Sequence, residues 1–373
     1  MERIKIAFII SNLGQGGAER QFLELIKNIN KSKFDVSVCL FAINRGIFYN
    51  EIESVENIQL IKNTLKNRNK IFKIIEALIF IFTYLKNNNF DIVFTSLFMN
   101  GFFVRVIAPD KYKSKIISSI RTSLTQYDKI HLFVEKYLLK KSFVITNSKI
   151  ACENLKLIVN KKYHFRISYI YNGYDTQLFS NDQKEIKRNV ILMGNVGRMT
   201  YLKNQIQILK VFSMLNNENL RIQIIGAYGD QTVLLSNFKK SILNSDRIEL
   251  IDKVPNIQDY YKKIDVFILS SFLEGCPNSL FEAMLSKCLC IISVNCNSDY
   301  FIENGINGFV YDGTDEGLKL VLLYVFNILN TPDELIIIEN GYKYAQEKFS
   351  MNSMVNNYEN LFMKIYEENK SSH

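Results

Sequence analysis

The sequence predicts an α/β protein built from two doubly wound domains. Strand patterns alternate with helical patterns twice along the chain, which is typical of helices packed on parallel sheets. Each series opens on a strand with apolar residues on both faces, Ile4 to Ile10 and Val190 to Val196. The length of 373 residues allows two domains of ordinary size.

Composition and charge agree with a globular chain whose halves differ. Hydrophobic residues make up 47% and charged residues 22%, which excludes a disordered chain. The net charge is +9; residues 1–170 hold 27 Lys+Arg against 13 Asp+Glu, whereas residues 171–373 hold 19 against 24. A first half at +14 and a second at −5 indicate two domains with different partners.

Cysteine and histidine usage argues against a metal site. The six cysteines form no Cys-x-x-Cys pair, no secretory leader precedes them, and there are three histidines. We therefore expect reduced cytosolic thiols and no metal. No uninterrupted apolar stretch reaches the roughly 20 residues of a spanning helix.

The first strand runs into a glycine-rich turn and a helix. Gly14, Gly16 and Gly17 do not have the Gly-x-Gly-x-x-Gly spacing, and no acidic residue ends the second strand, Phe34 to Phe41. The pattern therefore does not favour a dinucleotide-binding dehydrogenase. A short strand follows at 57–61.

Residues Lys62 to Lys86 predict a helix that is both basic and strongly apolar. Two interpretations remain open. One is a domain helix packed on its sheet with lysines on the wet face. The other is a membrane-surface helix whose cations meet anionic lipid.

Three further strands and a helix complete the first half. The strands are Asp91 to Thr95, Lys115 to Ile120 and Phe143 to Thr146, with a helix at Asp128 to Lys140. Arg121 follows the second of these strands, where it is either a phosphate or acceptor contact or a plain surface arginine. Asn147-Ser148 indicates a helix cap, and Ile167 to Tyr171 is the last strand.

The second half opens with a strand, a polar turn and the helix Gln205 to Leu215. Arg198 and Lys203 flank this turn, where two cations beside a helix amino terminus suit a diphosphate. Farther along the chain, the patterns predict strands at 220–226, 247–251, 264–269 and 290–294, and helices at 256–262, 314–330, 333–348 and 351–368.

Two carboxylates surround the turn after the strand that ends at Leu269. Glu274 lies in the loop with Gly275 and Pro277, and Glu282 lies one turn inside the following helix. In an open parallel sheet, ligands bind at the carboxyl ends of strands beside helix amino termini. Carboxylates accept hydrogen bonds from hydroxyl groups, so this pair suits a sugar.

The motifs together resemble the retaining family 4 glycosyltransferases. Glu-x7-Glu at 274–282 is similar to their donor motif, Gly197-Arg198 with Lys203-Asn204 to their diphosphate motif, and Gly16-Gly17-Ala18-Glu19-Arg20 to their amino-terminal loop. Asn172-Gly173-Tyr174-Asp175 matches their hinge sequence. The resemblance covers nearly the whole chain and is strongest across 190–310.

The resemblance implies the GT-B fold, in which two Rossmann-like domains face each other across a cleft. Residues 1–171 with 351–373 would bind the acceptor and residues 172–350 the nucleotide sugar, with the last helix crossing back to the first domain. Arg198, Lys203 and Glu274 would be catalytic. The expected substrate-binding set is Gly16, Gly17, Arg121, Asn172, Arg198, Lys203, Pro277, Asn278, Ser279, Leu280 and Glu282.

Some positions depart from the family pattern. Ser96 and Arg121 stand where relatives carry histidine, the turn Gly226 to Asp230 is one residue longer, and no Gly-Gly pair lies near Asn297-Ser298. These departures remove the basis for a histidine-assisted role.

The expected activity is therefore retaining transfer of a hexose from a nucleoside diphosphate sugar to a glycan or lipid-linked acceptor in surface polysaccharide synthesis. We expect no metal or other cofactor, no nucleic acid partner, and peripheral contact with an anionic membrane at the inner face of the plasma membrane. Two alternatives are a nucleotide-sugar epimerase of the same fold, which needs no acceptor, and a non-catalytic sugar-nucleotide-binding protein.

Overall fold

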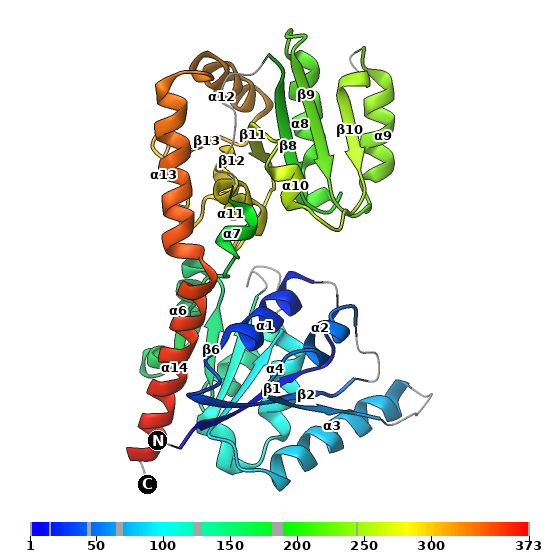
Figure 1. Ribbon diagram of the computed structural model, residues 1–373. Coiled ribbons are helices and arrows are strands. Elements are labelled where there is room, and N and C mark those ends of the chain that lie inside the picture. The colour runs from blue at the N-terminus through cyan, green and yellow to red at the C-terminus, as the bar shows by residue number, and fades with distance from the viewer. Residues whose placement is uncertain are drawn as a thin grey trace. The chain divides into compact units, whose positions relative to one another are not determined.

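The computed structural model describes residues 2–14, 16–42, 46–64, 70–121, 129–180, 189–243 and 245–371. The chain divides into two compact units (Figure 1). Unit 1 consists of residues 1–173 and 351–373, and unit 2 of residues 174–350. This division lies two residues after the expected end of the first domain.

Unit 1 is built on a seven-stranded parallel sheet. Its strand order is β3-β2-β1-β4-β5-β6-β7, so the order reverses between β1 and β4. The strands are β1 (Ile4–Ile10), β2 (Phe34–Leu40), β3 (Ile58–Lys62), β4 (Ile92–Ser96), β5 (Ile116–Ile120), β6 (Phe143–Thr146) and β7 (Ile167–Tyr169). The central strands β1, β4 and β5 have almost entirely buried side chains because helices cover both faces of the sheet.

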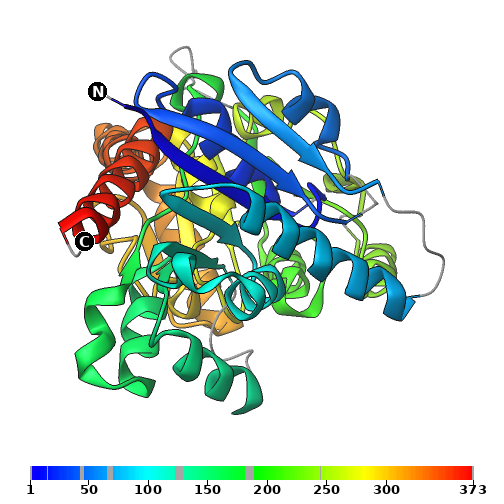
Figure 2. The same cartoon turned by 90° about the horizontal axis from the view of Figure 1, so that it is seen from below.

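Each face of this sheet carries its own hydrophobic cluster. On one face, α1 (Gly17–Asn28) and α14 (Met351–Ser371) pack on β4. The rings of Phe8 and Phe94 each contact those of Phe22 and Phe362. On the other face lie α3 (Lys70–Asn87) and α4 (Phe98–Ile107), which lie side by side (Figure 2). The last helix of the chain thus belongs to unit 1 by its packing.

Further short elements complete unit 1. They are α2 (Tyr49–Glu53), η1 (Asp110–Lys115), α5 (Lys129–Leu138), α6 (Lys149–Ile158) and η3 (Lys161–Arg166). The Ser148 side chain accepts a hydrogen bond from the Ala151 amide and caps α6, as the sequence predicts.

The predicted helix at Lys62 to Lys86 is wrong at its start. Lys62 is the last residue of β3, where it pairs with Leu40 of the neighbouring parallel strand β2. The helix begins at Lys70, and residues 65–69 lie outside the described residues. Its inner face is buried at Ile81, Tyr84 and Leu85.

The outer face of α3 carries the exposed lysines Lys73 and Lys86, as the first interpretation expects, and apolar side chains as well. Six large apolar side chains are exposed there: Ile71, Phe72, Ile74, Ile75, Ile79 and Phe82. The helix therefore packs on its sheet and also presents apolar residues outward.

Unit 2 is built on a six-stranded parallel sheet of order β10-β9-β8-β11-β12-β13, which reverses between β8 and β11. The strands are β8 (Ile191–Val196), β9 (Leu220–Ile225), β10 (Ile248–Ile251), β11 (Val266–Leu269), β12 (Leu289–Ser293) and β13 (Phe309–Tyr311). Strand β13 was not predicted, since its three residues follow the Asn304–Gly308 turn directly.

Helices cover both faces of this second sheet. One cluster joins α8 (Gln205–Met214), α9 (Thr232–Ser241) and α12 (Asp315–Ile328) to the sheet. On the other face, α11 (Asn278–Leu285) packs on α13 (Pro332–Phe349), with Phe281 stacked on Phe349 at 3.6 Å between ring centroids. The predicted helix at 256–262 is a single turn, α10 (Gln258–Tyr261).

The two doubly wound parallel domains predicted from the sequence are thus confirmed. Among the described helices, none is long and apolar enough to cross a membrane alone. The pair α12 and α13, bent by 113°, meets that test jointly by length and composition.

Candidate active site

The predicted site residues of unit 2 lie where the strand order of its sheet reverses. Arg198 and Lys203 follow β8, and Glu274 follows β11, its neighbour in the sheet. The connections after these two strands leave in opposite directions, which opens a crevice at the carboxyl edge. The fold therefore places all three side chains at the position where doubly wound sheets bind ligands.

Lys203 and Glu274 are in direct contact at this edge. Lys203 Nζ lies 2.5 Å from Glu274 Oε1, and the Ser271 hydroxyl donates to the same oxygen at 2.7 Å. Both side chains are mostly shielded, with 28% and 13% of their surfaces exposed. The loop carboxylate is therefore held in one orientation, with its other oxygen carrying no described side-chain bond.

Backbone contacts fix the loop that carries Lys203. The Ser270 hydroxyl donates to the carbonyl oxygens of Lys203 and Asn204, each at 3.0 Å. Asn204 adopts a left-handed conformation (φ 49°, ψ 35°), which lets a short 3-10 turn, η4 (Tyr201–Lys203), end where α8 begins. The hydrogen bonds of Ser270 thus hold the loop after β8 against the loop after β11.

Arg198 is exposed, and within the part of the chain that the structure describes its side chain has no ion pair or hydrogen bond. Its loop is shaped by Gly226, whose φ of +148° is open mainly to glycine. A Cβ atom at Gly226 would lie 2.4 Å from the Gly197 carbonyl oxygen, so only glycine allows this approach. The guanidinium is therefore positioned by its backbone and remains available to a ligand.

Glu282 lies inside α11, and its carboxylate accepts a hydrogen bond of 2.8 Å from the Tyr261 hydroxyl. The side chain as a whole is partly exposed, but the carboxyl group is enclosed by protein. This desolvation raises the pKa of Glu282 to about 7, against a smaller lowering effect of the Tyr261 bond. Charge on Glu282 thus depends on pH near neutrality.

The amino terminus of α11 supplies backbone donors. Pro277 stands at the N-cap position of this helix and provides no side-chain cap. The Asn278 side chain accepts a hydrogen bond of 2.7 Å from the Tyr174 hydroxyl. Leu280 is fully buried, and its backbone amide donates to the Pro277 carbonyl oxygen at 3.0 Å.

In unit 1, the predicted residues Gly16 and Gly17 begin α1, with Gly16 at its N-cap position. A Cβ atom at Gly16 would lie 2.3 Å from a Glu19 carboxylate oxygen. Gln21, in the next turn, exchanges two hydrogen bonds of 2.9 Å with the backbone of Gly173. The glycine turn and the hinge sequence therefore meet within this unit.

Arg121 and Asn172, both predicted to bind substrate, are brought together at the carboxyl edge of unit 1. Arg121 Nη1 donates to Asn172 Oδ1 at 2.5 Å, and its Nη2 donates to the Tyr358 hydroxyl at 3.4 Å. Through these two bonds Arg121 links the strand end to α14. Leu97, after β4, has a positive φ of 75°, a strained conformation for a branched residue.

Several contacts of the site have no local sequence signal. Tyr261 is 21 residues from Glu282, and Tyr174 is 104 residues from Asn278, so only the fold reveals these pairs. Ser271 lies beside the predicted motif, but nothing in its own identity marks it as a partner of Glu274. Among the described residues, no group of three or more His, Cys, Asp or Glu side chains is placed to hold a metal ion.

Comparison with known proteins identifies both halves of the chain. Residues 15–178 match the family model described as Glycosyltransferase Family 4, and residues 177–342 match the model for glycosyl transferases group 1. In structure, the chain is similar to a glycosyltransferase from Rickettsia africae, with a TM-score of 0.81, 19% identity, and coverage of 98% of this chain and 99% of that one. This likeness shows the GT-B fold.

Two curated relatives indicate the biological setting. The capsular polysaccharide biosynthesis glycosyltransferase CapH of Staphylococcus aureus is 31% identical, over 78% of this chain and 81% of the relative. The UDP-Gal:alpha-D-GlcNAc-diphosphoundecaprenol alpha-1,3-galactosyltransferase of Escherichia coli is 23% identical, over 84% and 85%. The chain belongs to glycosyltransferase family 4, and it is a GT-B glycosyltransferase of surface polysaccharide synthesis.

Proposed function

We propose that this chain is a retaining hexosyltransferase that moves a sugar from a nucleoside diphosphate sugar to a lipid-linked glycan. The observation that carries the donor half is the gathering of Arg198, Lys203 and Glu274 at the strand-order reversal of unit 2. The acceptor class is suggested by the E. coli relative, whose name specifies a diphosphoundecaprenol-linked acceptor.

The donor would span three groups of the site. Glu282 would bind the ribose hydroxyls, and Glu274 would bind hydroxyls of the transferred sugar. Arg198, Lys203 and the first amides of α11 would bind the diphosphate between them, because cations and helix amino termini both favour phosphate. Pro277 leaves that amino terminus free of a competing side-chain cap.

The chemistry assigned to these residues is stabilisation of a leaving group. As the bond from the sugar to the diphosphate breaks, negative charge grows on the phosphate oxygen, and Arg198 and Lys203 would stabilise it. Lys203 and Ser271 hold Glu274 through one carboxylate oxygen, and we assign this carboxylate to binding of the sugar and not to nucleophilic attack. We therefore propose that the departing phosphate oxygen takes the acceptor's proton while attack occurs on the same face of the sugar. This scheme requires no metal.

The binding of acceptor is proposed for unit 1. Arg121, Asn172 and the Gly16–Gly17 turn lie at or beside its carboxyl edge, which is the ligand-binding edge of a doubly wound sheet. The net charge of +14 over residues 1–170 favours an anionic acceptor and peripheral contact with the inner face of the plasma membrane.

A panel of sugar nucleotides, scored for protection against thermal unfolding, tests the donor assignment. We expect one sugar nucleotide to raise Tm more than its free nucleotide does, and we expect this gain to disappear in Glu274→Ala. Turnover of that donor without any acceptor would instead support the epimerase. The anomeric configuration of the product, read by NMR, decides between retention and inversion.

A further inference from the structure

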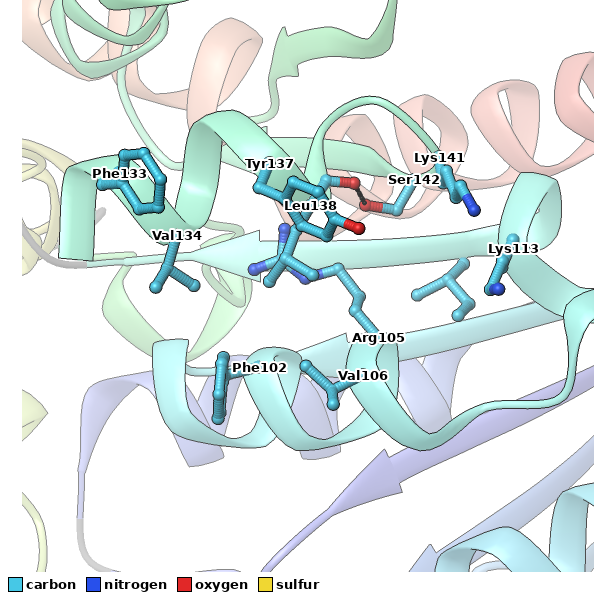
Figure 3. A pocket seen from close by; sticks show the side chains of 11 residues that line it. Phe102, Arg105, Val106, Lys113, Phe133, Val134, Tyr137, Leu138, Lys141 and Ser142 are labelled. Atoms are coloured by element: carbon cyan, nitrogen blue, oxygen red, sulfur yellow. Dashed lines mark hydrogen bonds between the residues drawn. The ribbon is translucent and has the colours of Figure 1, made fainter. Parts of the chain in front are cut away.

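An apolar groove lies between α4 and α5 on the outer side of unit 1 (Figure 3). Its volume is about 380 Å³, within the range of small-molecule sites. Phe102 and Val106 of α4 form one wall, and Phe133 and Tyr137 of α5 form the other. Phe133, Tyr137 and Val106 are 73%, 63% and 53% exposed, so this apolar surface is uncovered within unit 1.

The floor of the groove carries charges that are already neutralised. Arg105 donates to both carboxylate oxygens of Glu135, at 2.6 and 2.8 Å, and its Nε donates to the Gly101 carbonyl oxygen at 3.0 Å. Both side chains are almost completely buried. The pair uses its own hydrogen-bonding capacity, so these two side chains present no unpaired charge to an apolar occupant of the groove.

One end of the groove opens into a basic basin. Lys113 and Lys141 border both, and they lie together at the end opposite Phe102 and Phe133 (Figure 3). The basin is lined by Asp110, Lys113, Ser114, Lys140, Lys141 and Arg166. It thus carries four cations and one carboxylate, and that carboxylate, on Asp110, is paired with Lys113.

Arg166 is held in the basin by aromatic rings. Its guanidinium lies 4.9 Å from the ring centre of Phe143 and 5.0 Å from that of Phe165. Its Nε and Nη1 are buried, and neither has a hydrogen-bond partner among the described residues. The Glu368 carboxylate of α14 attracts the Arg166 guanidinium electrostatically. One of its oxygens, Oε1, also lies 3.9 Å from Lys364 Nζ, so Glu368 is shared between the two cations. The basin therefore retains an excess of positive charge.

We infer that the groove and basin together bind an anionic phospholipid of the membrane, with the lipid phosphate in the basin and an acyl chain in the groove. An apolar slot that ends in a cluster of cations is complementary to a molecule with an apolar tail and an anionic head. The exposed rings of Phe133 and Tyr137 would enter the interface beside it. This inference rests on the proposed membrane contact, but it does not depend on the transfer reaction.

The position of the basin separates this lipid from the reacting acceptor. The adjacent parallel strands β5, β6 and β7 begin three residues after Lys113, two after Lys141 and one after Arg166, so the basin lies at their amino ends. Substrates of doubly wound sheets bind at the carboxyl ends. The five residues of β5 place the two edges about 17 Å apart. A phosphate in the basin is therefore an anchor to the membrane surface.

Vesicle co-sedimentation of the full chain tests the site. The vesicles contain phosphatidylcholine alone, or with about one third phosphatidylglycerol as the anionic lipid. We expect binding to the anionic vesicles only, weakened by salt. Lys113→Gln with Lys141→Gln should lower the affinity about 10-fold or more, since each cation near a charged surface contributes to binding.

Two matched double variants serve as controls. Lys239→Gln with Lys240→Gln removes the same charge from α9 of unit 2 and should leave vesicle binding unchanged. Ile75→Ser with Ile79→Ser alters the exposed face of α3, and it should weaken binding less than Phe133→Ser with Tyr137→Ser does. For every variant, Tm is measured to check that the chain is folded. The rise in Tm on adding the sugar nucleotide checks that the donor site is intact.

The outcomes separate this inference from the proposed membrane contact. Absence of binding to any vesicle overturns both. Binding that survives the Lys113 and Lys141 changes, or that is abolished only by the α3 variant, keeps the membrane contact and overturns the lipid site. In competition, a short-chain phosphatidic acid should displace vesicles at far lower concentration than inorganic phosphate; equal potency would show a free-phosphate site and overturn the lipid assignment.

Discussion

The carboxyl edges of the two sheets differ in how their polar groups are arranged. In unit 2, Lys203, Ser271 and Glu274 form one connected cluster beside the strand-order reversal. In unit 1, the hydroxyls of Thr95 and Ser96, at the end of β4, are buried and have no hydrogen-bond partner among the described residues. One edge thus carries an ion pair, whereas the other carries these neutral hydroxyls and the hydrogen bond from Arg121 to Asn172.

The most buried ion pair among the described residues of unit 1 lies away from the carboxyl edge of its sheet. Arg105 and Glu135 join α4 to α5 and are almost fully buried, whereas Lys203 and Glu274 keep part of their surfaces exposed. A buried pair stabilises through completed hydrogen bonds, and an accessible pair can exchange its bonds with a ligand. The comparison indicates that the Arg105–Glu135 pair is structural, whereas the Lys203–Glu274 pair is accessible to a ligand.

The largest effect that tests this comparison is on stability. Arg105→Ala leaves the Glu135 carboxylate buried without its partner, and we expect the free energy of unfolding of unit 1 to fall by about 3–5 kcal/mol. Calorimetry of the full chain measures this as a lowered transition. The double variant Arg105→Met with Glu135→Leu removes both charges and should be closer to the wild type. A loss under about 1 kcal/mol in Arg105→Ala would mean that the pair is not structural.

The second effect is on catalysis with little change in stability. Arg198 is exposed and has no side-chain bond in the described parts of the chain, so Arg198→Ala should keep Tm within a degree or two of the wild type. Turnover should fall by about 10²-fold or more, because charge on the departing diphosphate would lose a partner. Lys240→Ala, which removes a cation from α9, provides the control. Unchanged turnover in Arg198→Ala would exclude a role in leaving-group stabilisation.

Much of unit 2 can be predicted from sequence because its signals are local. The Gly-Arg and Glu-x7-Glu motifs each lie in one strand-to-helix connection, so spacing alone places Arg198 and Glu274 at the carboxyl edge. What joins the two connections is not local. The contact of Lys203 with Glu274 spans 71 residues and depends on β8 and β11 being neighbours in the sheet.

Unit 1 is less predictable for a physical reason. Alternating apolar patterns identify its central strands, but Lys62 joins the strand β3 because it pairs with β2, despite the helical pattern that follows it. The role of Arg121 was ambiguous in sequence, because its partners Asn172 and Tyr358 are 51 and 237 residues away. Tertiary contacts of this length leave no spacing that a single sequence reveals.

A third effect is the pH dependence of stability that Glu282 of unit 2 should produce. The pKa of Glu282 is raised to about 7 in the folded chain and returns to about 4.5 on unfolding, so the folded state holds the extra proton between these values. The contribution of Glu282 to stability is therefore fully present below pH 4.5 and is lost as pH rises through 7. Glu282→Gln lacks this loss, so its Tm relative to the wild type should increase from pH 5 to pH 8.

The same titration should appear in donor binding. If Glu282 binds ribose hydroxyls as a carboxylate, the donor favours the ionised form, and the Kd for the donor should fall as pH rises through about 7. Calorimetric titrations from pH 5.5 to 8 measure this change. A Kd that is independent of pH in the wild type, or that varies equally in Glu282→Gln, contradicts the assignment.

The smallest effect isolates a single hydrogen bond of the donor site. Tyr261→Phe removes the hydroxyl that donates to Glu282 Oε2, at a cost of about 1 kcal/mol in stability. Since that bond partly offsets the desolvation of the carboxyl group, its loss should raise the pKa of Glu282 further and move the midpoint of donor binding to higher pH. Tyr260→Phe changes the neighbouring tyrosine, which has no described bond to Glu282, and should leave the midpoint unchanged. An unshifted midpoint in Tyr261→Phe would mean that burial alone sets the charge of Glu282, and the tyrosine would then serve only packing.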